Sequence, residues 1–222
     1  MSQLNFTDIR NENIADVENL FSNKLNNLAE LNLILTNYSL PFFKRDHNDL
    51  LYFYKGDKIT SKEIIVFDNN TSLMFLFDGI LTLLFNANPI SVKMLQRSVY
   101  EFLIVNNHLI LTDDHFYVDK WNKKKDIKIV KTLLKRTDNP YSKDLIDFWV
   151  NLSKQSHASL ETTNPGLDIN ETYGEYVDNI FITYVLLFFY NYQLRNLYFP
   201  FMKSVYKRLD INIKEPYVSD WF

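Results

Sequence analysis

The stretch "NPISVKMLQRSVYEFLIVNN" (residues 88–107) decides the fold. Asn88 followed by Pro89 is typical of a helix start, because the asparagine side chain caps free backbone N–H groups and proline fits the first helical position. At 100° per residue, the apolar residues that follow point in nearly every direction. A helix that is apolar all round is buried, so we expect this helix to lie at the centre of the protein.

The composition favours an all-α protein built as a helical bundle. Only 4 of the 222 residues are glycine and 6 are proline, too few for a β-sandwich or a Rossmann fold. Aromatic residues make up 16%, so the core should contain many packed rings. We find no internal repeat and no linker rich in glycine or serine, and predict a single helical domain over residues 1–222. Its expected parts are a core bundle (60–190), an N-terminal helix packing on it (1–40) and an extended tail (210–222).

Several boundaries are predicted before the central helix. An apolar stripe predicts a helix over residues 7–37, and Pro41 should end that region. An irregular connection or a short hairpin is expected near residues 49–60. Thr60 followed by Glu63 is a capping box that opens the next helix, which the poor helix formers "DNNTS" (68–72) should split.

After the central helix, residues 112–136 predict one or two helices, and a further helix is expected over about 142–160. A long aromatic helix should cover about 172–198, with Pro200 interrupting it. Its run "IFITYVLLFFYNYQL" (180–194) is shorter than the roughly 20 apolar residues that a membrane span needs. We therefore expect a buried helix there and no membrane span.

The absence of cysteine excludes disulfides, thiol catalysis and zinc sites that contain cysteine. The first residues have neither a basic segment nor an apolar core, so no signal peptide is expected. Together these features predict a cytoplasmic protein.

The central helix carries one polar line, formed by Arg97, Glu101 and His108. Removing an unpaired charge from water costs several kcal/mol, so Arg97 and Glu101 should be paired. They could pair with each other, but arginine before glutamate is the weaker order for a surface pair in a helix. A buried network that reaches another helix is the better explanation. His108, near the helix end, is more simply a partner of the helix dipole than a ligand.

The helix over 142–160 supplies the partner. Ser153, Ser156 and His157 lie inside the arc of its apolar residues, so they should face the central helix. We therefore predict a buried cluster of Arg97, Glu101 and His157, assisted by Ser153. A neutral imidazole can accept from Arg97 with one nitrogen or donate to Glu101 with the other.

Two roles stay open for this cluster. It could be structural, since polar networks between core helices often specify packing register. It could instead be catalytic or bind a ligand. The sequence has no Walker loop, no G-x-G-x-x-G, no H-E-x-x-H and no cluster of metal ligands, so we expect no metal and no cofactor.

The segments "SVKMLQRSVYEFLIVNNHLI" and "FWVNLSKQSHASLE" resemble an uncharacterised all-helical bacterial family, a domain of unknown function. In that family an R-x3-E helix precedes a helix with S-x3-H, matched here by Arg97, Glu101, Ser153 and His157. The resemblance covers roughly residues 60–190. It implies a helical bundle with a polar centre.

A more distant similarity is to the HEPN nucleases, helical bundles found in toxin and phage-defence systems. Those enzymes cut RNA with an Arg-x4–6-His motif on one helix. No arginine lies four to seven residues before His157, so Arg97 would have to act from another helix.

The segment "KWNKKKDIKIVKTLLKR" (120–136) is strongly basic. Lys124, Lys128, Lys131 and Lys135 fall on one face of a helix. Such a face can be merely solvated, or it can bind RNA or another polyanion, or an anionic membrane surface.

Two functional hypotheses follow. The first is a non-catalytic helical protein that binds a protein partner or forms a homodimer, within a bacterial stress or phage-defence system by family resemblance. The second is an HEPN-like, metal-independent ribonuclease. In it His157 would act as general acid and base, Arg97 would stabilise the phosphorane charge, and Lys124, Lys128 and Lys131 would guide RNA.

Overall fold

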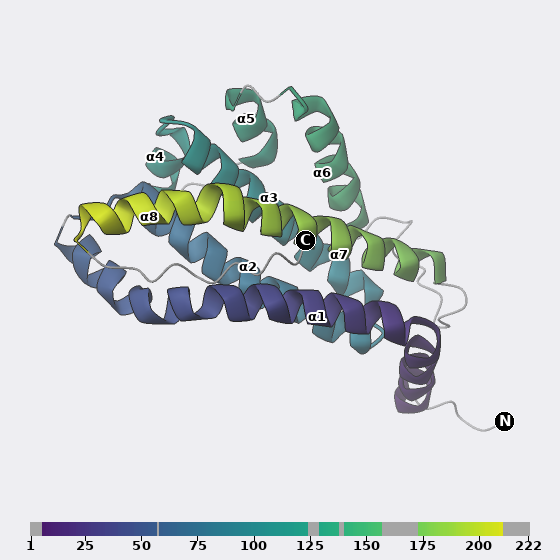
Figure 1. Cartoon of the computed structure of the whole chain (residues 1–222). Helices are drawn as coiled ribbons and strands as arrows, with labels where there is room; N and C mark the ends of the chain where they lie inside the picture. Colours follow the sequence, from purple (N-terminus) through teal and green to yellow (C-terminus); the bar gives the residue numbers. More distant parts are fainter. Residues whose placement is uncertain (1–5, 57, 124–128, 138–139, 157–172, 211–222) are drawn as a thin grey trace.

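The computed structural model describes residues 6–56, 58–123, 129–137, 140–156 and 173–210. The described residues form helices and contain no strand, which confirms the all-α class (Figure 1). In chain order the helices are α1 (Phe6–Lys55), α2 (Ser61–Phe85), α3 (Pro89–Leu111), α4 (Phe116–Asn122), α5 (Ile129–Arg136), α6 (Ser142–Ser156), α7 (Tyr173–Gln193), the π-helical segment η1 (Leu194–Tyr198) and α8 (Phe199–Arg208).

Helix α3 is central, as predicted. It packs against α2, α5, α6 and α7, while α1 packs against α2 and α7. Figure 1 shows α4, α5 and α6 on the side of the bundle away from α1. The rod formed by α7, η1 and α8 runs between these two sides.

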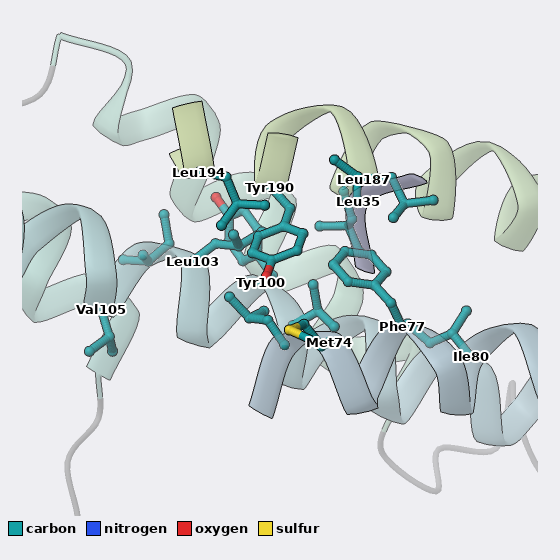
Figure 2. Packing of buried hydrophobic residues seen from close by; sticks show 14 of the residues in the cluster. Leu35, Met74, Phe77, Ile80, Tyr100, Leu103, Val105, Leu187, Tyr190 and Leu194 are labelled. Carbon is teal, nitrogen blue, oxygen red and sulfur yellow. The ribbon is translucent and has the colours of Figure 1, made fainter. Parts of the chain in front are cut away.

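Most of the buried apolar side chains of the core come from α1, α2, α3 and α7. Figure 2 shows Leu35 of α1, Phe77 of α2, Leu103 of α3 and Tyr190 of α7 close together. The rings of Phe77 and Tyr190 stack with centroids 5.4 Å apart, and both side chains are buried. The abundance of aromatic residues thus serves ring packing, as the composition predicted.

Both predicted helix starts are confirmed by their caps. The Thr60 side chain accepts from the backbone N–H of Glu63, and the Glu63 carboxylate accepts from the N–H of Thr60. The Asn88 side chain accepts from the N–H of Ser91, with Pro89 following at the start of α3. Each cap satisfies backbone donors that the helix itself leaves free.

Two predicted interruptions of the N-terminal helices are wrong. Helix α1 continues through Pro41 to Lys55, so no hairpin occupies residues 49–55, and the irregular connection is confined to residues 56–60. A proline inside a helix costs about 3 kcal/mol, which the packing of this long helix offsets.

Helix α2 also runs unbroken through residues 68–72. There the buried Asn70 donates to the carbonyl of Val66, and the buried Asn69 donates to Asn106 of α3. Side chains that usually compete with a helix instead bond here to the helix backbone, in the case of Asn70, or to α3, in the case of Asn69.

Pro200 does not end the last long helix either. The chain stays helical from α7 into α8 through η1, whose residues take the wider π-helical turn just before the proline. A π-helical turn shifts the hydrogen-bond register, which accommodates the missing proline N–H.

Helix α7 is buried on one side only, against the expectation for residues 180–194. Its outward face carries Phe181, Val185, Phe188 and Tyr192, which are 65%, 39%, 52% and 57% exposed. We call these four residues the α7 stripe.

One described helix, Ser61–Phe85, is long and apolar enough to cross a membrane by length and composition, and 61% of its most apolar window is buried inside the protein. The core helix of a bundle has the same properties, so this is a weak indication.

Candidate functional site

Arg97 and Glu101 form an ion pair on α3 that reaches helix α6. The Arg97 Nε donates to Glu101 Oε1 at 3.0 Å. The indole Nε1 of Trp149 on α6 donates to the same oxygen at 3.0 Å, and the Arg97 guanidinium lies 5.7 Å from the Trp149 ring centroid. A polar network therefore joins these two helices, and its member from α6 is Trp149, whereas the prediction had named His157 and Ser153.

This pair is half-buried. Arg97 and Glu101 each keep 28% of the side chain exposed, so the expectation of a buried pair is wrong. The partly exposed guanidinium is already neutralised by Glu101. Its net attraction for a phosphate is weaker than that of a lone arginine.

The other members of the predicted cluster have separate outcomes. Ser153 is buried on α6, as expected for the inward face of that helix. Ser156 is the last residue of α6, and His157 lies outside the described residues. Within the described residues Glu101 also acts on α4, because burial and then the Glu101 charge raise the pKa of Tyr117.

His108 belongs to a different polar cluster, between the end of α3 and the end of α5. Its Nδ1 lies 3.0 Å from the Thr137 hydroxyl, which donates to the carbonyl of Leu133. Because that hydroxyl hydrogen is already used, the imidazole must donate from Nδ1. Its Nε2 then faces the Asp114 carboxylate, 3.6 Å away.

Burial keeps this histidine neutral. His108 is fully buried, and desolvation lowers its pKa more than Asp114 raises it, while Arg136 and Lys62 lower it further. Asp114 is held by the Arg136 guanidinium at 2.8 Å. Burial therefore works against the expected role as a charged partner of the helix dipole, since a neutral imidazole brings no positive charge to the helix end.

The most extensive buried polar contacts lie between α3 and α7, where no prediction placed them. Buried Lys93 bonds the Glu175 carboxylate. The Gln96 amide donates to the carbonyl of Asn179 at 2.8 Å and to the Thr183 hydroxyl at 3.0 Å. We call these contacts, with Gln193 donating to the carbonyl of Leu103, the α3–α7 seam.

A sequence signal for the seam existed. Lys93 and Gln96 are polar residues three positions apart in a helix that is mostly apolar, and Asn107 continues the face of Gln96. On α7, Glu175, Asn179 and Thr183 follow at spacings of four. Matching these two faces requires knowing that the helices are neighbours, which periodicity alone does not give.

Only part of the predicted lysine face can be placed. Lys124 and Lys128 lie outside the described residues, while Lys131 and Lys135 are exposed on α5. Val130 and Leu134 are buried, so another face of α5 packs into the bundle. Helix α4 ends at Asn122, before the predicted lysine face, and the described part of α5 begins at Ile129.

The Lys131 ammonium lies 5.9 Å from the Trp149 ring centroid. Trp149 therefore has two cations near its ring, Lys131 from α5 and Arg97 from α3. Among the described residues no group of three or more histidine, cysteine or acidic side chains could hold a metal ion.

Comparisons of the chain with family models, with curated proteins and with solved structures found no match.

Proposed function

We propose that this chain is a non-catalytic helical protein that acts by binding another protein chain. The observation that carries the proposal is the α7 stripe, four apolar side chains exposed side by side along one helix. Soluble proteins rarely leave such contiguous apolar patches in water, and patches of this kind mark interaction surfaces. Aromatic residues dominate the stripe, as they do at protein interfaces.

The geometry around Arg97 supports a structural role for the polar centre. Its Nε bonds Glu101, and Glu101 is tied to Trp149 of the neighbouring helix. These contacts join α3 to α6, and removing any member would loosen that joint. The resemblance to the uncharacterised bacterial family adds a stress or phage-defence system as the setting.

The alternative is an HEPN-like ribonuclease that uses Arg97 and His157. One observation favours it: Arg97 is partly exposed, and exposed Lys131 lies beside the same Trp149 ring. The two cations can attract a phosphate, and the aromatic ring between them can stack on a base.

RNA cleavage separates the two functions. We expect no cleavage by the wild-type protein, and we expect Arg97→Gln and Trp149→Phe to lower the melting temperature. His157→Ala and His157→Gln should leave RNA intact as well. The opposite outcome would be RNA cleavage by the wild type that both Arg97→Gln and His157→Ala abolish without changing the melting temperature. That outcome would establish the ribonuclease and refute the non-catalytic proposal.

Lysine variants complete the test. Lys131→Glu with Lys135→Glu should leave the behaviour of the protein toward RNA unchanged if α5 is a solvated surface. A matched control is Lys203→Glu with Lys207→Glu on α8, which are also exposed. Salt-sensitive RNA binding that only the α5 pair abolishes would support the polyanion site.

A further inference from the structure

The α7 stripe has an internal two-fold symmetry. The exposed side chains of the stripe, Phe181, Val185, Phe188 and Tyr192, follow one another at steps of four, three and four residues. Reading this series backwards gives the same steps, so its midpoint lies between Leu186 and Leu187. Those two leucines are buried on the opposite side of the helix.

Charge is placed in keeping with this symmetry. Asp178 is exposed at one end of the stripe, and Arg195 is partly exposed at the other. None of residues 179–194 is charged, so these two side chains are the nearest charges along the helix on either side of the stripe.

We propose that the α7 stripe binds the same stripe of a second copy of this chain, with the two α7 helices antiparallel. The two-fold axis then places Asp178 opposite Arg195 at both ends of the contact. Phe181 faces Tyr192, and Val185 faces Phe188. An isologous contact of this kind closes on itself and makes a dimer, not a filament. The inference rests on the proposed partner-binding function and identifies the partner.

The step pattern suits this pairing. Apolar residues at alternating steps of three and four form the seam of two-stranded coiled coils, where side chains of one helix insert between those of the other. Parallel helices would bring Asp178 next to Asp178 and Arg195 next to Arg195, which is unfavourable. The end charges therefore select the antiparallel arrangement.

The size of the stripe sets the strength of the dimer. A large aromatic side chain offers about 150–250 Å², so the exposed fractions of the stripe correspond to about 400 Å² in each copy. About 800 Å² over both copies lies below the roughly 1,200 Å² of stable complexes. The dimer should therefore be weak and should dissociate on dilution.

Sedimentation of the full chain over a roughly hundredfold range of concentration tests this inference. We expect a monomer–dimer equilibrium, with Phe181→Ser raising the dimer dissociation constant at least about tenfold. The matched control is Phe75→Ser on α2, which removes a phenyl ring that is 73% exposed and lies outside the stripe. It should leave the dissociation constant unchanged.

Charge exchange tests the orientation. Asp178→Arg or Arg195→Asp alone puts like charges opposite each other at both ends and should weaken the dimer about tenfold. Asp178→Arg combined with Arg195→Asp should restore the dimer dissociation constant to within about threefold of the wild-type value. Asp144→Arg, at an exposed acid on α6, is the control for the change in net charge. Melting temperatures accompany each variant, because the Asp178 charge also acts on Lys93.

Several results would overturn the inference. These are a monomer at every concentration, a dimer that Phe181→Ser leaves intact, or a double exchange no better than the single ones. Loss of vesicle co-sedimentation in Phe181→Ser, with no dimer in the wild type, would assign the stripe to a membrane surface. A monomeric chain refutes only this pairing, whereas Arg97-dependent RNA cleavage refutes the non-catalytic function and leaves the dimer standing.

Discussion

Replacing Glu175 with glutamine should destabilise the protein more than replacing its partner Lys93 with methionine. Lys93 is 6% exposed on α3, and its ammonium bonds the Glu175 carboxylate at the start of α7. Glutamine leaves a buried ammonium without its bonded carboxylate. Methionine removes the charge and keeps most of the volume of the lysine stem.

The burial of the pair sets the magnitude. Removing one partner of a buried ion pair costs about 3–5 kcal/mol. Here the Glu175 side chain is 30% exposed and Asp178 also attracts Lys93, so we expect about 2–3 kcal/mol for Glu175→Gln. Lys93→Met should change the free energy of unfolding by less than about 1 kcal/mol, because apolar replacement of such pairs is often neutral. The double variant should resemble Lys93→Met alone.

Urea unfolding followed by circular dichroism measures these differences, and the melting temperature of Glu175→Gln should fall by about 5–10 °C. Burial lowers the pKa of Lys93, so the unfolded chain holds this proton more tightly than the folded protein. The stability of Glu175→Gln should therefore rise as the pH increases toward the ordinary lysine pKa of 10.5. A Glu175→Gln variant as stable as Lys93→Met would refute the reasoning.

Three further predictions concern single groups. Trp149→Phe keeps an aromatic ring but removes the donor to Glu101. The free energy of unfolding, measured in urea, should therefore fall by about 1 kcal/mol. No loss would mean that this bond contributes nothing to stability. Burial lowers the pKa of His108, so the stability of the protein should fall as the pH drops below the ordinary histidine pKa of 6.5. The variant His108→Gln should lack this part of the pH dependence of stability. An identical pH profile in the variant and the wild type would contradict the prediction. Burial raises the pKa most for Tyr100, Tyr176 and Tyr190. Their ionisation, followed by ultraviolet absorbance above about pH 10, should therefore coincide with loss of helical signal, and earlier ionisation would count against their burial.

The sequence was sufficient for features that depend on neighbours along the chain. The capping box at Thr60 and the Asn88–Pro89 start need only residues within one helical turn, and both are present. The position of α3 at the centre also followed from its apolar residues. In contrast, α1 and α2 continue through Pro41 and residues 68–72 because tertiary packing outweighs local preference.

The part of the candidate site that depends on neighbours along the chain was also predictable. Arg97 and Glu101 lie one turn apart, and their pairing needs only helix geometry. Trp149 was not among the predicted members of the cluster, yet its indole N–H supplies the bond to Glu101. Periodicity sorts residues into faces but does not give the rotation of one helix against another, which decides the atom that meets the carboxylate.

Helix α7 shows why rotation matters for function. Its inward face carries Asn179, Thr183 and Gln193, all buried and bonded to α3, beside its apolar core residues. Its outward face between Asp178 and Arg195 presents the four apolar side chains of the α7 stripe. A helix that meets only water on its outward side normally has the opposite distribution, with polar residues outside. The polar residues inside bond α3, which explains their position on the buried face. The apolar residues on the outward face are exposed on a single bundle, and the proposed second copy would cover them and bury α7 on both sides.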